Sequence, residues 1–420
     1  MRIRMEKSVN YASTKSFKEN KNMKSAPTVY AVVLSAILCL IFINGCEMDV
    51  AGPIWDKPYT VPPTPTITSV VPAQATAGVL TITINGEDFA SAPGINSVYF
   101  DNISSEVISS TSSSIVVRRP NLVTDSAVIK VVTSQTLSAV KYFPYKVEQV
   151  MERYGNFDEN ITLSVIAVDN QENVYVIEGN NVHKVSLDGT KSVFATANRA
   201  SYDAVLGHDG NLYLLGNNRA VDKVDLSTGQ VTRWIQMPSG KNVRYGDFDG
   251  HGNFYAGGNK TDLVVVGTNL SAKPASGYYA GFEILAIRTY ANYVYVAAKN
   301  AAYVDTAKIF RHQIDTSGSL GGQELVLDMR TSGDLSLRTI KGISFSAAGI
   351  MYLATDAVNP IVTYNPANGN IDYLYKDILR PYCKSFYWGT GNYIYMINGD
   401  ATAGEAWTVY RVNAGINGIH

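Results

Sequence analysis

Basic and tyrosine side chains recur in the second half of the chain at a fixed distance from a repeated phrase. The phrase has forms such as "NLYLL" and "NFYAG", and its copies centre on Tyr175, Tyr213, Tyr255, Tyr295, Tyr352 and Tyr395. The positions eleven residues earlier are Ser164, Tyr202, Arg244, Ile284, Lys341 and Lys384, with Glu283 beside the fourth. Lysine and arginine donate to carboxylates and hydroxyls, and aromatic rings stack on apolar faces. If these positions converge, the pattern predicts a site for an anionic or decorated glycan.

The spacing of the phrase indicates how the chain would bring these positions together. The six tyrosines are separated by 38 to 57 residues, which is the period of a repeat architecture. Each copy can be divided into four short strands, as one propeller blade requires. The stretch "AVDNQENVYVIEGNNVHKVSLDG" resembles the NHL-like six-bladed β-propellers. That resemblance implies a ring of four-stranded blades over residues 147–420, with the first strand of each blade facing the central opening.

The ends of such a ring must be joined, because an open blade would expose an unpaired edge strand. The last copy ends soon after "WTVYRVN", which leaves little chain for a fourth strand. The segment "KVEQVMERY" before the first copy is a spare strand. We therefore predict that residues 146–153 supply the outer strand of the sixth blade and close the propeller.

One rim of the predicted ring carries the longest loops and most of the candidate ligand-binding residues. Long segments follow the fourth tyrosine, precede the fifth and follow the sixth. Elaborated loops on a rigid scaffold are typical of binding surfaces. The predicted ligand-binding set is Tyr202, Arg244, Tyr279, Glu283, Lys341, Tyr382 and Lys384. The alternative is that these cations are solvated strand ends without a common function.

The N-terminal region predicts a lipid anchor. The apolar run "VYAVVLSAILCLIFI" is short for a membrane-spanning helix and follows Lys21 and Lys24, as in a secretory signal peptide. "INGC", which ends at Cys46, resembles the bacterial lipobox, and this implies cleavage after residue 45 and lipidation of Cys46. Met23 is an alternative start. An uncleaved N-terminal membrane anchor is the alternative to the signal peptide.

Two further regions precede the repeats. Residues 46–64 contain four prolines, in "GPIWDKPYTVPPT", after the predicted lipid site and favour an extended tether. Residues 65–146 alternate apolar and polar residues in short runs, which predicts an all-β sandwich. The phrase "TITINGEDF" and the strand "AVIKVVT" resemble the IPT/TIG immunoglobulin-like domain, which implies an Ig-like fold. We expect this domain to act as a spacer.

Several enzyme classes find little support in the sequence. The chain has no "GxSxG" or "HExxH" motif and no paired Cys or His residues at zinc spacing. A metal lactonase would need acids at the inner-strand mouths, where only Glu283 is suitable. The loop after Asp247 has oxygen ligands at alternate positions but lacks a closing carboxylate at Gly258, so an ordinary turn is favoured over calcium binding. Cys383 is more consistent with a buried apolar residue than with a nucleophile.

The sequence therefore predicts an all-β lipoprotein of the outer membrane or cell surface that binds a glycan or a partner protein. We expect a monomer without a catalytic site, metal or cofactor. The net charge of −1 gives no reason to expect nucleic acid. The alternative is a propeller polysaccharide lyase or hydrolase, in which lysine or tyrosine would act as base and arginine would hold the carboxylate of an acidic sugar.

Overall fold

The computed structural model describes residues 62–134, 139–158, 161–275, 277–300, 307–331, 338–399 and 406–419. These residues form β-strands and two single-turn 3-10 helices, η1 (Pro93–Ile95) and η2 (Met329–Thr331). The prediction of an all-β chain is thus confirmed. No helix within the described ranges is long and apolar enough to cross a membrane. The predicted leader and Cys46 lie outside the described residues.

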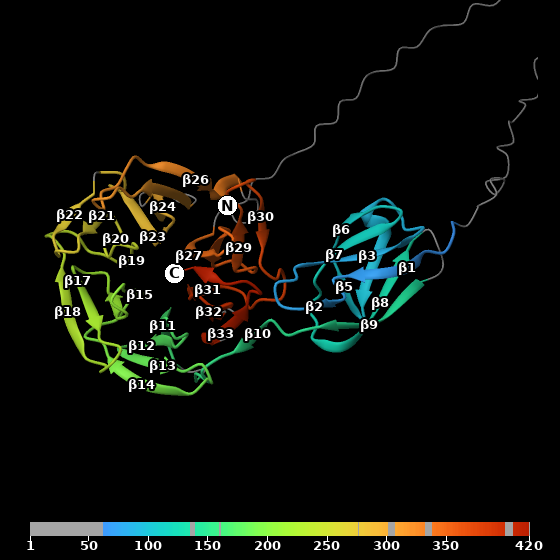
Figure 1. The fold of residues 1–420 in the computed structure, drawn as a ribbon, viewed down its shortest axis with the longest axis horizontal. Coiled ribbons are helices and arrows are strands. Elements are labelled where there is room, and N and C mark those ends of the chain that lie inside the picture. The colour runs from blue at the N-terminus through green and yellow to red at the C-terminus, as the bar shows by residue number, and fades with distance from the viewer. Residues whose placement is uncertain are drawn as a thin grey trace, which may run out of the picture. The chain divides into compact units, whose positions relative to one another are not determined.

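The first part of the described chain is a sandwich of two sheets (Figure 1). One sheet has the order β1 (Thr66–Val71), β3 (Thr81–Glu87), β7 (Ser114–Arg118), β6 (Val107–Ser110). The other has the order β2 (Gln74–Ala75), β9 (Ala139–Val147), β8 (Thr124–Thr133), β4 (Asn96–Phe100), β5 (Ile103–Ser105). Alternate residues such as Ile82 and Ile84 are fully buried, because successive side chains of a strand point to opposite faces.

The second part contains six further sheets among the described residues, each built around an antiparallel run of strands in chain order. The first three sheets are β11 (Leu163–Val168), β12 (Val174–Glu178), β13 (Asn181–Val185), β14 (Lys191–Thr196); β15 (Asp203–Leu206), β16 (Leu212–Leu215), β17 (Ala220–Val224), β18 (Val231–Gln236); and β19 (Tyr245–Phe248), β20 (Phe254–Gly258), β21 (Thr261–Val266), β22 (Ala272–Pro274). The fourth is β23 (Phe282–Tyr290), β24 (Tyr293–Asn300), β25 (Lys308–Gln313), β26 (Glu324–Asp328).

The fifth and sixth sheets each include a strand from another part of the chain. The fifth is β27 (Ile340–Ser346), β28 (Met351–Thr355), β29 (Ile361–Tyr364), β30 (Ile371–Tyr373), with β34 (Gly418–Ile419) on the free side of β27. The sixth is β31 (Cys383–Trp388), β32 (Tyr393–Asn398), β33 (Thr408–Asn413), with β10 (Met151–Arg153) beside β33. Residues 151–153 of the predicted 146–153 segment therefore pair with the last long strand of the chain. The inward position of β34 was not predicted.

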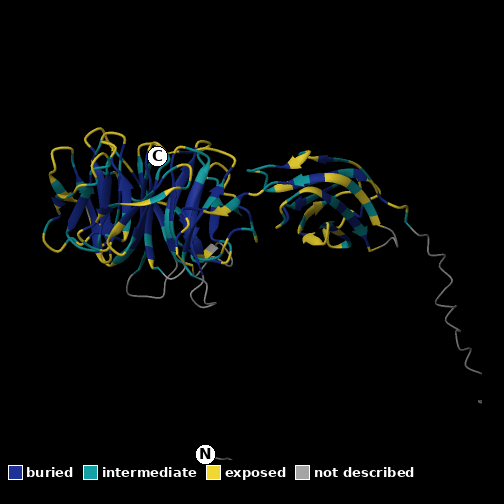
Figure 2. Cartoon of the chain, turned by 90° about the horizontal axis from the view of Figure 1, so that it is seen from below, coloured by how far each residue is buried: buried dark blue, intermediate teal, exposed yellow. Residues whose placement is uncertain are grey.

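The first strands of the six sheets pack against one another in order. β11 contacts β15, β15 contacts β19, β19 contacts β23, β23 contacts β27, β27 contacts β31, and β31 contacts β11. Figure 1 shows the sheets arranged radially, with these strands nearest the common centre. The loops that join the strands are exposed while the strands themselves are largely buried (Figure 2). The starts of the first strands thus lie toward one mouth of the arrangement, and their ends lie toward the other.

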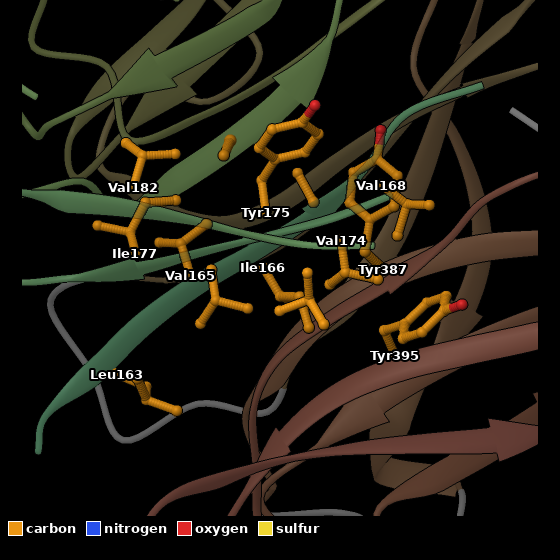
Figure 3. Packing of buried hydrophobic residues seen from close by; sticks show 14 of the residues in the cluster. Leu163, Val165, Ile166, Val168, Val174, Tyr175, Ile177, Val182, Tyr387 and Tyr395 are labelled. Carbon is orange, nitrogen blue, oxygen red and sulfur yellow. The ribbon is translucent and has the colours of Figure 1, made fainter. Parts of the chain in front are cut away.

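The repeated tyrosines are core residues. All six side chains are buried. Tyr175 and Tyr395 lie in one apolar cluster (Figure 3). The hydroxyls of Tyr175 and Tyr255 donate to Oδ2 of Asp169 and Asp249 at 3.0 and 2.9 Å. Each aspartate lies in the turn between the first and second strands of a sheet. In these two copies the repeated phrase therefore combines a packed ring with a hydrogen bond that fixes the preceding turn.

A carboxylate joins the first sheet of the second part to the last. Glu172, in the β11–β12 turn, accepts hydrogen bonds from the backbone N–H groups of Thr390 and Gly391 at 3.1 and 2.9 Å. Thr390 and Gly391 belong to the β31–β32 turn. A Cβ atom at Gly391 would approach the Glu172 carboxylate to 3.0 Å, so this close contact favours glycine. The junction between the two ends of the repeat region thus depends on a specific side chain.

Candidate functional site

Three of the six aligned positions lie where the pairing of a first strand is irregular. The register of β11 shifts between Leu163 and Val165, and the register of β27 shifts between Ile340 and Gly342. The register of β31 shifts between Cys383 and Ser385. The residues that fall within these three register shifts are Ser164, Lys341 and Lys384. Because a β-bulge redirects the side chain of the extra residue, these strand starts are suited to present polar groups beside an apolar core.

Lys341 and Lys384 line a narrow pocket together with Tyr202. The pocket has a volume of about 50 Å³, and Tyr202, Lys341 and Lys384 are among its lining residues. Lys384 Nζ donates to the Leu163 carbonyl oxygen at 2.5 Å and lies 5.3 Å from the centre of the Trp407 ring. Burial lowers the pKa of the Lys384 ammonium, and the charge of Lys341 lowers it further. We call the end of the ring defined by Tyr202, Lys341 and Lys384 the lysine mouth.

Arg244 and Glu283 form a separate ionic group. Arg244 Nη1 lies 3.2 Å from Glu283 Oε1, and Arg244 Nε donates to Asn217 Oδ1 at 2.7 Å. Lys299 Nζ lies 3.4 Å from the other Glu283 oxygen. The Arg244 guanidinium also lies 5.1 Å from the centre of the Tyr202 ring. Neither Arg244 nor Glu283 lines the narrow pocket. The two residues form an ion pair with one another outside it.

The three predicted tyrosines have different environments. Tyr202 is 49% exposed and lines the lysine mouth. Tyr279 is fully buried, and its hydroxyl forms a 2.8 Å hydrogen bond with His312 Nε2. The prediction that Tyr279 contacts a ligand at the rim is therefore wrong, since adjacent Tyr278 and Tyr279 could not be distinguished by sequence. Tyr382 has a positive φ of 53° and does not line the narrow pocket, so it is not brought together with the lysines.

Two charged residues that were not predicted from the sequence also line the same pocket. They are Asp203 and Arg288. Asp203 is only partly accessible within the narrow channel, and desolvation raises the pKa of its carboxyl to about 7. Arg288 is buried, lies 3.7 Å from Asp247 Oδ2 and donates to the Ile343 carbonyl oxygen at 3.0 Å. Charges inside otherwise apolar strand segments were the signal that could have revealed this layer.

A second, larger cavity lies at the other mouth of the ring. It has a volume of about 590 Å³ and is lined by the turns between first and second strands. Asn170, His208, His251 and Asn292 come from four such turns, and Thr316 comes from the β25–β26 turn. We call this end the turn mouth. This mouth could not be predicted from the sequence, because Gly, Asp and Asn in these segments match ordinary turn chemistry.

The aspartates of these turns are occupied by internal hydrogen bonds. Asp249 Oδ1 accepts from the backbone N–H groups of His251 and Asn253, and Oδ2 accepts from the Asn253 amide and the Tyr255 hydroxyl. This pattern agrees with the interpretation of the segment as a structural turn. Within the described ranges, no group of three or more His, Cys, Asp and Glu side chains is arranged to hold a metal ion.

Cys383 is buried, as predicted. Its Sγ donates to the Ser385 carbonyl oxygen at 3.2 Å, and burial raises the pKa of the thiol. A buried thiol with a raised pKa is a poor nucleophile, because thiolate is the reactive form. This residue therefore contributes packing at the start of β31.

Comparison with protein families supports the N-terminal assignment. Residues 65–145 match the IPT/TIG domain, which confirms the predicted family resemblance in that region. A search of curated protein sequences finds no significant match to the chain. The family match covers the sandwich and leaves the second part of the chain to be interpreted from its own structure.

Solved structures resemble the chain at low sequence identity. A luciferin-regenerating enzyme has a TM-score of 0.50 and 13% identity, and the match covers 64% of this chain and 97% of that one. An auxiliary nutrient binding protein from Bacteroides thetaiotaomicron has a TM-score of 0.49, 12% identity and coverage of 84% and 98%. Regucalcin from Agrobacterium tumefaciens, a calcium-binding protein, has a TM-score of 0.49, 14% identity and coverage of 63% and 94%. The first likeness supports a propeller-like fold, and none of the three identifies a ligand for this chain.

Proposed function

We propose that this chain is a non-catalytic binding lipoprotein of the outer membrane or cell surface that captures an acidic glycan at the lysine mouth. The observation that carries the proposal is the placement of Lys341 and Lys384 in one pocket with the exposed ring of Tyr202. Two ammonium groups suit carboxylates along an acidic polysaccharide, and the tyrosine ring suits the apolar face of a sugar. Arg244 and Tyr382 would contact parts of the glycan outside the pocket.

The six sheets are, in this proposal, the blades of a closed six-bladed β-propeller over residues 147–420. The pairing of β10 with β33 and the cyclic packing of the first strands support closure. A closed ring would hold the strand starts rigidly, so that ligand binding would cost little conformational entropy. The sandwich would serve as a spacer between the tether and the ring.

The lipid anchor rests on the sequence of the leader. Residues 1–45 would be the signal peptide, Cys46 would carry the lipid, and residues 46–64 would form the tether. Metabolic labelling with a radioactive fatty acid tests this directly. Cys46→Ala should abolish incorporation into the protein, whereas Cys39→Ala, in the apolar run, should leave labelling of the mature protein unchanged. Equal labelling of the Cys46→Ala protein would contradict the anchor.

Affinity electrophoresis of the full chain tests the ligand class. Polygalacturonate in the gel should retard the protein, and methyl-esterified polygalacturonate should do so much less because its carboxylates are neutralised. The Lys341→Ala/Lys384→Ala double variant should lose most of the retardation. A matched control is Lys141→Ala/Lys273→Ala, which removes two exposed lysines away from the mouth. Equal loss in both variants would indicate a general charge effect and would contradict the proposed site.

A partner protein is the alternative occupant of the same mouth. Cross-linking in intact cells with a photoreactive amino acid at Tyr202 separates the two possibilities. A discrete protein adduct, together with no retardation by any acidic polysaccharide, would replace the glycan proposal. Retardation without such an adduct would support it.

A polysaccharide lyase is a second candidate function, favoured by one observation. Asp203, with a pKa raised to about 7, and Lys384, with a lowered pKa, line the same pocket. A base and an acid of shifted pKa in one cleft could remove the proton beside a uronate carboxylate and protonate the departing glycosidic oxygen. Incubation with polygalacturonate would then give an unsaturated product with new ultraviolet absorbance. Retardation without product would support binding alone.

A further inference from the structure

The turn mouth has the features of a separate ligand site. Its cavity of about 590 Å³ falls within the roughly 300–1,000 Å³ of small-molecule sites. The volume is more than ten times that of the pocket at the lysine mouth, which is about 50 Å³. The two mouths also differ in composition, because no lysine or arginine among the described residues lines the larger cavity.

The floor of the cavity is apolar and firmly supported. Leu206, Phe248 and Ile314 contribute aliphatic and aromatic surface. The ring of Tyr290 stacks on Phe345 with centroids 4.1 Å apart and an interplanar angle of 8°. Since Phe345 is buried in the core, the Tyr290 ring is held in place. Such a floor suits a ligand with an apolar face.

The wall of the cavity carries groups that both donate and accept hydrogen bonds. Five of them come from five different turns and the sixth, Tyr290, ends β23. Among the described residues these side chains have no hydrogen-bond partners: Asn170, His208, His251, Tyr290, Asn292 and Thr316. The Asp315 carboxylate is engaged through Oδ1 with Ser317 and Ser319. The unpaired groups of the wall are therefore mostly amides, imidazoles and hydroxyls, which can pair with the hydroxyl groups of a ligand.

The C-terminal end of the chain completes the wall. β34 pairs with β27, and Ile419 lines the cavity. The strand is held further by hydrogen bonds from the Gly418 N–H to the Gly391 carbonyl at 3.0 Å and from the Ala347 N–H to the Asn417 carbonyl at 2.8 Å. A Cβ at Gly418 would come within 2.4 Å of the Gly389 carbonyl oxygen, so the chain passes very close to the neighbouring turn. Residues 417–419 thus fix one side of the cavity.

We infer that the turn mouth binds a neutral mono- or disaccharide, with a ring face on the Phe248 and Tyr290 floor and hydroxyls paired with the amides and imidazoles of the wall. A neutral sugar fits because it offers an apolar face and many hydroxyls and needs no cation. The site is independent of the lysine mouth, so either can fail alone. An anionic ligand would lack a cationic partner here, and this separates the two mouths chemically.

Titration calorimetry of the full chain with glucose, galactose, mannose, N-acetylglucosamine, maltose and lactose tests this inference. We expect saturable binding of at least one sugar. His208→Ala/His251→Ala should weaken it about tenfold or more, because each lost hydrogen bond removes part of the affinity. Both imidazoles are exposed, so the double variant should keep the thermal stability of the parent protein.

A cavity-filling variant provides a sharper test. Gly250 lines the cavity, and open space surrounds its Cβ position, so Gly250→Phe should fill the cavity without disturbing the backbone. Gly322 also has open space around its Cβ position and does not line the cavity, which makes Gly322→Phe the matched control. Binding should be lost in the first variant and retained in the second.

Two results would overturn the inference. One is the absence of binding for every sugar of the panel. The other is binding that persists in Gly250→Phe but disappears in Lys341→Ala/Lys384→Ala, which would assign the sugar to the lysine mouth. If polygalacturonate did not retard the parent protein while sugar binding was intact, the proposed function would be contradicted and this site would remain supported.

Discussion

The two mouths of the ring are built from the two ends of the same first strands, yet they differ in chemistry. The strand starts at the lysine mouth vary in residue type and carry bulges at Ser164, Lys341 and Lys384. The strand ends at the turn mouth lead into short turns fixed by aspartates such as Asp249. Bulges allow charged side chains to leave the strand surface, whereas fixed turns present neutral groups around a roomy cavity. The arrangement of the strands therefore sets where these residues lie, and the local bulges and turns set which chemical groups each mouth presents.

A buried ion pair separates the two mouths and should give the largest effect. Arg288 is the cationic partner of buried Asp247, so Arg288→Met would leave that carboxylate without a cation. We expect a loss of about 3–5 kcal/mol in the free energy of unfolding, measured with urea. Arg288→Met/Asp247→Asn should recover much of that loss.

A matched surface substitution serves as the control for this prediction. Arg311→Met removes an arginine whose Glu324 partner is exposed, and it should cost about 1 kcal/mol or less. If Arg288→Met lowered the free energy of unfolding no more than Arg311→Met, the Arg288–Asp247 ion pair would not be a structural element that separates the mouths.

The Asp203 carboxyl should make stability depend on pH. Its pKa in the folded protein is about 7, above the ordinary 3.8, so the folded state retains a proton that the unfolded chain releases. The protonated Asp203 carboxyl contributes fully to the free energy of unfolding below about pH 4. This contribution is lost as the pH rises to about 7, with a slope of at most about 1.4 kcal/mol per pH unit. Unfolding measured from pH 4 to 8 should show this fall for the parent protein relative to Asp203→Asn. If the free energies of unfolding of the two proteins changed with pH in the same way, Asp203 would lie in a well-solvated site and the lyase alternative would be weaker.

The junction between the first and last sheets should give an intermediate effect. Glu172→Ala removes the acceptor of the Thr390 and Gly391 N–H groups and should lower the free energy of unfolding by about 1–3 kcal/mol. The loss should be accompanied by faster hydrogen exchange of the β31–β32 turn. Glu324→Ala, at an exposed ion pair, is the control and should change stability by less than about 1 kcal/mol. Unchanged exchange in that turn would argue against closure through Glu172.

Two tyrosines should separate structure from binding with the smallest effects. Tyr279→Phe removes the buried hydrogen bond to His312 and should cost about 1 kcal/mol without changing retardation by polygalacturonate. Tyr202→Ala, at an exposed ring, should change stability by about 0.5 kcal/mol or less and weaken retardation. The reverse result would restore Tyr279 as a rim residue and remove Tyr202 from the site.

Most of the fold could be predicted from the chain. The alternation of apolar residues predicted the strands, and the recurrence of tyrosine predicted the repeated sheets. The spare strand near Met151 was predicted to pair at the last sheet because an open edge needs a partner. β34 was missed because a two-residue strand has no periodicity, and only contact with β27 defines it.

The sequence by itself indicated where the first strands begin, because counting eleven residues back from three of the tyrosines reaches Tyr202, Lys341 and Lys384, which line one pocket. Only the tertiary structure decided which of these share a pocket, since Arg244 and Glu283 engage one another and Tyr279 is buried. It alone revealed the turn mouth, which gathers residues from five turns far apart in the chain. Short-range spacing follows from backbone geometry, whereas side-chain pairing, burial and cavities arise from packing between segments that no local pattern relates.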